Sequence, residues 1–285
     1  MNATALESVL RRDRMIVAAA LAMLIAMAWV YIVALANSMA SGGMSMGGMP
    51  MHESASMNMD ANAGTTLGGM LAPAFKPWTI VEFTTTFVMW AVMMVGMMMP
   101  SAAPMILIYA RVGRQAALQG KPFAATGFFA GGYLLAWFLF SLAATGGQWA
   151  LDRAALLTPM MATTSDVLGA LVLIAAGLFQ WTPVKDVCLK HCQAPLSFIQ
   201  HHGGFRRDAL GSLAIGFRHG TYCVGCCWAL MALLFVGGVM NVLWIAGLAI
   251  FVLLEKVIPL GRIVSRVAGV ALTAWGMWLL VAALR

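Results

Sequence analysis

The sequence predicts an all-α protein, a polytopic transmembrane bundle of about seven helices with a cytoplasmic N-terminus. Of its 285 residues, 62% are hydrophobic and only 9% are charged, and the mean hydropathy is +0.87. This composition is typical of a membrane protein and excludes a soluble domain. Since a helix needs about 20 apolar residues to cross the hydrocarbon core, the apolar runs give the expected spans: residues 16–36, 79–99, 123–145, 166–181, 221–240, 242–257 and 267–284.

These runs divide the chain into three segments. We expect a tail with the first transmembrane helix at 1–36, a flexible loop outside the cytoplasm at 37–78, and a six-helix transmembrane domain at 79–285. The first helix has an alternative interpretation as a cleaved signal, because basic residues precede it and small residues end it. Its apolar run is longer than that of a usual signal peptide, which favours a retained anchor.

Lysine and arginine give the orientation, because short cytoplasmic loops retain them. With the N-terminus inside, twelve lie in cytoplasmic segments: Arg11, Arg12, Arg14, Arg111, Arg114, Lys121, Lys185, Lys190, Arg206, Arg207, Arg262 and Arg266. Only Lys76, Arg153 and Arg285 fall outside. The net charge of +7 is thus explained by topology in a lipid bilayer, and no nucleic-acid partner is expected.

The outer loop is rich in methionine, glycine and serine. Its thioethers belong to Met39, Met44, Met46, Met49, Met51, Met57, Met59 and Met70, and His52 lies among them. A solvent-facing linker gains nothing from apolar side chains, whereas thioether sulfur is a soft ligand that suits Cu(I). The loop therefore predicts metal capture; the alternative is a linker whose composition has drifted.

The second span continues the methionine bias. Met89, Met93 and Met97 recur every four residues and form one stripe along a helix. We expect Met97 and Met98 to be candidate ligands, with simple packing as the alternative. Pro100 and Pro104 are expected to lie past this span or to bend its last turns.

Two cysteine groups carry the sharpest chemistry. Cys188 and Cys192 follow the fourth span, and Cys223, Cys226 and Cys227 begin the fifth. Because these two spans are antiparallel neighbours in the predicted topology, all five thiols should converge on the cytoplasmic side, where they stay reduced. Such soft ligands at a membrane helix indicate a functional site.

The spacing of the thiols leaves three interpretations open. A Cys-x-x-Cys pair suits soft-metal binding and dithiol exchange alike, and buried structural thiols are common in apolar helices. A closed zinc site needs about four cysteine or histidine ligands, whereas Cu(I) accepts fewer soft ones. We therefore expect Cu(I), with zinc as the second metal.

The remaining polar residues are weaker candidates. His219 stands one helical turn before Cys223, and His191 lies between the cysteines of the first group, so both are candidate ligands. His201 and His202 are expected to be solvated. Glu255 and Lys256 are expected to pair with each other or with Arg218.

Several motifs resemble, in order, a known bacterial family described as predicted metal-binding integral membrane proteins. They are Trp90 with Met97-Met98-Met99-Pro100, Gly132-Tyr133 with Trp137, the run from Gln180 to Lys185 with Cys188 and Cys192, the run from Cys223 to Met231, and Glu255-Lys256 with Pro259. The resemblance covers residues 78–284 and implies a metal-binding bundle in the bacterial inner membrane. From the residues themselves, we expect Gly131-Gly132-Tyr133 and Trp137 to serve close helix packing and to carry no chemistry.

Together these observations predict a multi-pass protein that captures, transfers or delivers Cu(I), with a periplasmic copper chaperone or a cuproprotein as partner. No catalytic residue is expected, and no nucleotide-binding motif that would drive a pump is found in the sequence. The alternative function is a membrane thiol-disulfide oxidoreductase that relays electrons through the cysteine pairs. A third is a passive assembly subunit with structural thiols.

Overall fold

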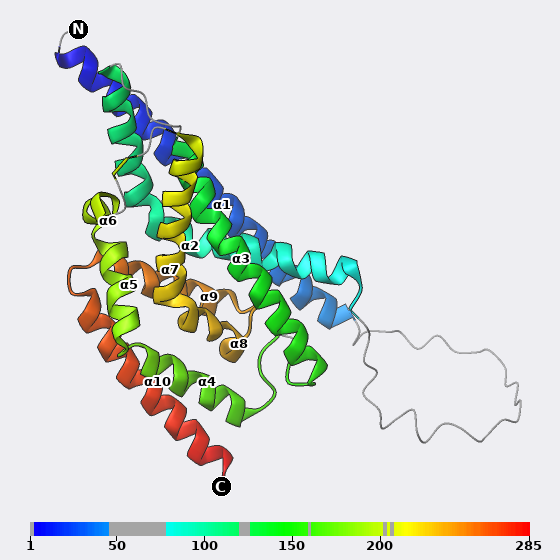
Figure 1. Ribbon diagram of the computed structural model, residues 1–285. Helices are drawn as coiled ribbons and strands as arrows, with labels where there is room; N and C mark the ends of the chain where they lie inside the picture. The colour runs from blue at the N-terminus through cyan, green and yellow to red at the C-terminus, as the bar shows by residue number, and fades with distance from the viewer. Residues whose placement is uncertain (1–2, 46–77, 120–125, 159–160, 202–203, 206–207) are drawn as a thin grey trace, which may run out of the picture.

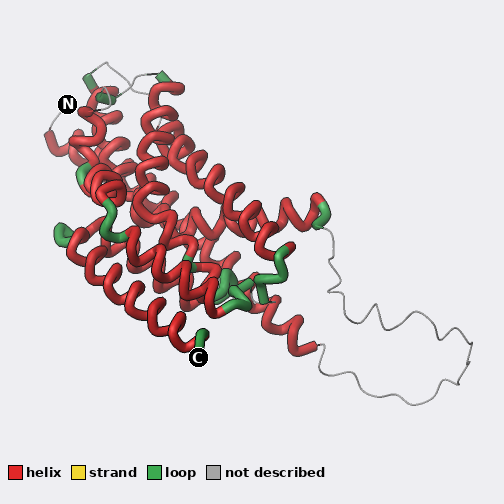
Figure 2. Tube along the Cα trace, turned by 60° about the horizontal axis from the view of Figure 1, so that its bottom comes forward, coloured by secondary structure: helices red, strands yellow, loops and turns green. Residues whose placement is uncertain are grey.

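The computed structural model describes residues 3–45, 78–119, 126–158, 161–201, 204–205 and 208–285. Over these ranges the chain is helical, with no strand and a single isolated bridge between Leu157 and Thr163; Figure 2 shows the helices in red. The all-α prediction is confirmed. The helices, labelled in Figure 1, are α1 (Ala3–Ser45), α2 (Ile80–Leu118), α3 (Thr126–Arg153), α4 (Asp166–Phe179), α5 (Pro183–Gln193), α6 (Pro195–His201), α7 (Ala209–Ala232), α8 (Leu234–Gly237), α9 (Val242–Val257) and α10 (Gly261–Ala283).

Within the described ranges, five stretches are long and apolar enough to cross a membrane: Met15–Ser38, Ile80–Ala116, Thr126–Arg153, Ala209–Gly237 and Gly261–Ala283. Helices α4 and α5 would together give a sixth span, bent by 65°. The remaining predicted span, 242–257, corresponds to α9, which has only 16 residues. At 1.5 Å per residue it is about 24 Å long, shorter than the ~30 Å hydrocarbon core.

Helix α7 begins earlier than predicted. The polar residues before Thr221 were expected to lie outside the membrane, but the helix begins at Ala209, where the side chain of Asp208 accepts a hydrogen bond from Gly211 N at 2.6 Å. Such an N-cap satisfies an amide that has no partner inside the helix. The second cysteine group therefore lies in the middle of a helix, and the prediction that it begins a span was wrong.

Helix α2 is also longer than predicted. It runs without interruption through Pro100 and Pro104, although each proline removes one helical hydrogen bond. Near the first proline, Tyr133 Oη donates to the carbonyl of Met98 at 3.1 Å, and Ser101 Oγ donates to the same carbonyl at 2.8 Å. These side chains from α3 and α2 add polar contacts at the turn that Pro100 disturbs.

Helices α3 and α7 approach closely through small residues. A Cβ at Gly220 would lie 2.6 Å from the Cβ of Ala136 and 2.9 Å from the carbonyl oxygen of Tyr133. Glycine is therefore needed where α7 crosses α3, as is common between membrane helices. This contact places Tyr133 opposite Cys223, one turn further along α7.

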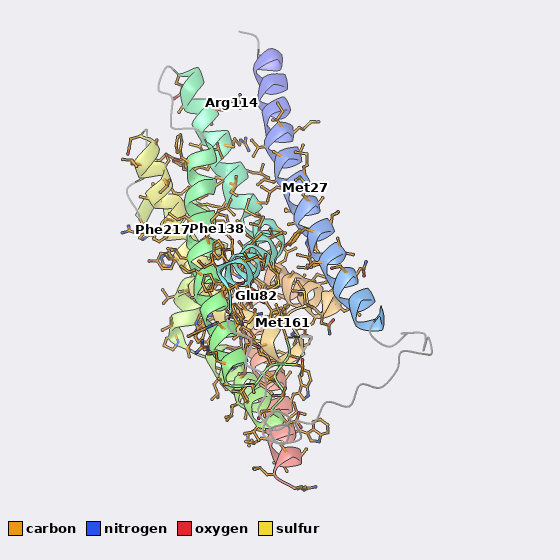
Figure 3. All side chains as sticks on the ribbon, turned by 90° about the vertical axis from the view of Figure 1, so that its right-hand side faces the viewer. Met27, Glu82, Arg114, Phe138, Met161 and Phe217 are labelled. Atoms are coloured by element: carbon orange, nitrogen blue, oxygen red, sulfur yellow. The ribbon has the colours of Figure 1, made fainter. Side chains whose placement is uncertain are left out.

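The bundle is elongated, with the N-terminus and the C-terminus at opposite ends (Figure 1). Figure 3 shows Arg114 of α2 near the end of the bundle where α1 begins. Glu82, at the start of α2, and Met161, between α3 and α4, lie nearer the level at which α1 ends. Of the described helices, α1 packs mainly on α2. The segment 46–77, which carries most of the methionine-rich loop, lies outside the described residues.

Candidate metal centre

The centre of the bundle is lined by one face of α7. His219, Cys223, Cys226, Cys227 and Met231 are all buried there. Their spacing of three and four residues places them in a stripe along the helix. The stripe faces the other helices and not the surface, so soft ligands lie in the core of the protein.

Helix α5 brings the other two thiols to this stripe. Its start is fixed by Pro183 at the first helical position and by Thr182, whose hydroxyl accepts from Lys185 N. Cys192 Sγ then lies 3.9 Å from Cys226 Sγ. Cys188 Sγ packs against Gly225, where a Cβ would be only 2.9 Å from the sulfur, so the two cysteine groups lie together.

Cys223 is the hub of this cluster. Its carbonyl oxygen accepts from the thiols of Cys226 and Cys227, at 3.1 and 2.9 Å, and Cys192 Sγ lies beside Cys226 Sγ. We call these four thiols the thiol cluster. Cys227 Sγ also lies 3.9 Å from Met98 Sδ. This contact adds a thioether from α2, and Met98 is one of the two candidate ligands predicted in that helix.

Cys223 has two further partners that the sequence did not reveal. Lys256 Nζ donates to its sulfur at 2.8 Å, and Tyr133 Oη lies 3.1 Å away. Lys256 also donates to Ser101 Oγ at 3.3 Å. The sequence signal for this contact was a lysine in an apolar helix, because a buried cation needs a partner. The sequence did not show that the partner is Cys223.

The expected pairing of Glu255 was wrong. Its carboxylate forms an ion pair with Lys185 at 2.6 Å, with the two side chains 2% and 1% exposed. Ser265 Oγ also donates to this carboxylate, and Lys185 Nζ donates to Gln180 Oε1 as well. Glu255 and Lys256 are consecutive but point to different helices, and Arg218 is exposed.

The candidate histidines lie on the edge of the cluster. His219 is buried among the rings of Phe129, Tyr133 and Phe198, and its Nδ1 has no hydrogen-bond partner among the described residues. The His191 ring stacks on Tyr222 with centroids 4.4 Å apart. The contacts of both rings are thus with aromatic side chains beside the cluster.

The structure describes only some of the other candidates. Met97 is buried in the core, whereas the side chain of Met44 and all of Met46, Met49, Met51 and His52 lie outside the described residues. His201 is exposed, as expected; His202 is not described.

The thiols are close together but are not arranged around an ion. Within the described part of the chain, no three His, Cys, Asp or Glu side chains stand in a geometry that could hold a metal. Two reasons are visible: Cys226 and Cys227 donate to the carbonyl of Cys223, at 3.1 and 2.9 Å, and Lys256 contacts the sulfur of Cys223. An ion would need these thiols to turn toward it.

Comparison with known proteins identifies a related family. The family model PpoB2, described as a copper chaperone, matches residues 87–279, more than half of the chain, and the match includes all five cysteines. Searches of curated proteins and of solved structures gave no match. The expected relation to a metal-related family is supported.

Proposed function

The chain belongs to the copper chaperone family PpoB2, and from this premise we propose that it binds Cu(I) within the membrane and passes the ion to another protein. The observation that carries the proposal is the thiol cluster, with Met98 beside it, inside the family's matched region. We further propose that it lies in the bacterial inner membrane with its N-terminus in the cytoplasm.

The ligand set favours Cu(I) over harder ions. Thiolate and thioether sulfur are soft donors that select Cu(I), whereas magnesium, calcium and manganese prefer oxygen. Within the cluster, Cys192, Cys223 and Cys226 supply sulfur from two helices, and on this proposal their side chains turn to surround one ion. Zinc remains the second metal, because a closed zinc site also uses cysteine.

Lys256 fits a monovalent cargo. Two thiolates and one Cu(I) carry a net charge of −1, and the ammonium of Lys256, 2.8 Å from Cys223 Sγ, offsets it. An uncompensated charge is costly in a low-dielectric interior. On this proposal Lys256 contacts Cys223 in the empty protein and turns toward Ser101 when copper binds.

We propose that methionines bring the ion to the cluster. The loop at 37–78 would collect copper outside, and the buried stripe of α2, which includes Met93, Met97 and Met98, would carry it inward by exchange between weak ligands. The donor or acceptor would be a periplasmic copper chaperone or a cuproprotein.

Copper content tests the proposal directly. Protein purified under reducing, anaerobic conditions should retain copper, and a variant with all five cysteines replaced by serine should lose it, as measured by elemental analysis. Equal copper in the two proteins would refute a thiol site. Circular dichroism of both proteins controls for unfolding.

Met98→Leu tests the contribution of the thioether. Leucine has nearly the same volume, so the substitution should cost less than about 1.5 kcal/mol of stability while lowering Cu(I) affinity in a chelator competition by at least about tenfold, the loss typical even of groups that only orient a ligand. Met105→Leu is the matched control, because Met105 is equally buried in α2 but lies outside the proposed path. Equal affinities for the two variants would exclude Met98 as a ligand.

Thiol-disulfide oxidoreductase activity is a second candidate function, because two cysteine sulfurs from different helices lie close together. Cys192 Sγ and Cys226 Sγ are 3.9 Å apart and join two helices, so a modest movement would allow a disulfide. All five cysteines are reduced in this structure. The substitutions that separate this function from copper binding are described in the Discussion.

A further inference from the structure

We propose that His191 and His201 form a second Cu(I) site, separate from the thiol cluster, in a cavity between α5 and α6. The proposal rests on the copper function above and adds the place where the ion is exposed to an acceptor. The cavity has a volume of about 430 Å³, and both histidines line it together with Phe198. We call it the α5–α6 cavity.

Both imidazoles are held in the same way. Nδ1 of His191 lies 2.8 Å from the carbonyl oxygen of Val187, and Nδ1 of His201 lies 2.8 Å from that of Ser197. A carbonyl oxygen only accepts, so in each ring Nδ1 carries the hydrogen and Nε2 of the neutral ring has the lone pair. This is the arrangement in which metal-binding histidines are usually fixed, by a backbone carbonyl behind the ring.

The lining of the cavity selects a metal of low charge and low coordination number. It contains no cysteine, aspartate or glutamate among the described residues, so it lacks the four ligands of a closed zinc site. Lys190 also lines the cavity, and its ammonium repels a divalent ion about twice as strongly as a monovalent one. Imidazole is a good ligand for copper, which leaves Cu(I) on two nitrogens as the best fit.

The cavity and the thiol cluster share a wall. His191 directly precedes Cys192, and its ring stacks on that of Tyr222, which directly precedes Cys223. On the same wall, the ring of Phe198 lies 5.1 Å from that of His219. The cluster is buried, whereas His201 is exposed, so copper on the two imidazoles is within reach of an incoming ligand.

The test is a Cu(I) titration of the full chain under anaerobic, reducing conditions, with X-ray absorption used to distinguish nitrogen from sulfur ligands. We expect a tight copper with sulfur ligands and a weaker one with nitrogen ligands. In the double variant H191Q/H201Q the nitrogen-bound copper should weaken at least about tenfold, with the sulfur-bound copper unchanged. Transfer to an external chelator should slow in parallel. Gln200→Ala, at an exposed position of α6 outside the lining of the cavity, should behave as the wild type.

Three results would overturn the proposal. They are no nitrogen-bound copper in the wild type, nitrogen-bound copper that persists in H191Q/H201Q, and nitrogen-bound copper that disappears instead in His52→Gln. Loss of the sulfur-bound copper in a folded H191Q/H201Q variant would show that the histidines belong to the thiol site, which also contradicts a separate site. Failure of the proposed thiol site gives a different result. In that case the variant with all five cysteines replaced by serine would keep its full sulfur-bound copper.

Discussion

Cys227→Ser should lower bound copper severely, as should Cys223→Ser and Cys226→Ser. A copper site gains from each added soft ligand, and the thiols of Cys226 and Cys227 lie against the backbone of Cys223, one turn along α7. Each substitution should weaken Cu(I) binding by at least about tenfold. We expect the largest loss for Cys223→Ser, because Cys223 is the hub of the cluster. The measurement is a chelator competition with anaerobically purified protein.

The same variants separate copper binding from thiol exchange. A dithiol exchanger needs two sulfurs, so under that function Cys227 would be dispensable while one pair of cysteines formed a reversible disulfide. If Cys227→Ser keeps full copper affinity while Cys192→Ser and Cys226→Ser, which remove the pair of sulfurs 3.9 Å apart, abolish a reversible disulfide, the protein is an oxidoreductase. Cys188→Ser is the matched control; Cys188 is only partly buried and its sulfur packs against Gly225, so its loss should have the smallest effect.

Lys185→Met should lower the free energy of unfolding by about 3–5 kcal/mol, because it leaves the carboxylate of Glu255 buried without its ion-pair partner. The double variant Lys185→Met/Glu255→Leu should recover most of that loss, since replacing a buried pair by apolar residues is often neutral or stabilising. Equilibrium unfolding in mixed detergent micelles measures both values, and the cycle with Glu255→Leu gives the coupling between the two residues.

The chain offers a surface pair as a control. Asp186 accepts from Arg262 Nη2 at 2.5 Å, but these side chains are 21% and 44% exposed. Asp186→Asn should therefore cost no more than about 1 kcal/mol. If Lys185→Met lowers the free energy of unfolding no more than Asp186→Asn does, then water reaches the Lys185–Glu255 pair. The pair would then not be buried as the structure shows it.

The fold class could be predicted because apolar runs of sufficient length suit only membrane helices. The start of α7 could not be read in the same way, since Arg218 and His219 look like the edge of a membrane when composition alone is considered. The capping residue Asp208 was the better signal, because a cap depends on local hydrogen bonds and not on hydropathy. Hydropathy therefore locates helices, while caps locate their ends.

The partners within the site depended on how the helices are rotated about their axes. Cys192 and Cys226 could be brought to one region from topology alone, and the structure places their sulfurs 3.9 Å apart. The contact of Lys256 with Cys223 depends on the rotation of α9 against α7, which no local pattern in the sequence encodes. The same holds for the pair of Glu255 with Lys185, for which the nearest charged neighbour in sequence was the wrong partner.

The consecutive placement of Glu255 and Lys256 has a mechanical consequence. Successive residues on a helix point about 100° apart. Glu255 therefore bonds to Lys185 on α5, while Lys256 bonds in another direction to Cys223 on α7. Together the two bonds fix both the position of α9 along its axis and its rotation about that axis. A helix too short to span the bilayer receives little positioning from the lipid. Here two charged side chains set its register in the empty protein. When Lys256 leaves Cys223, the buried pair of Glu255 with Lys185 still holds α9 against α5, so a thiol that moves to accept a cargo does so beside a helix that keeps its position.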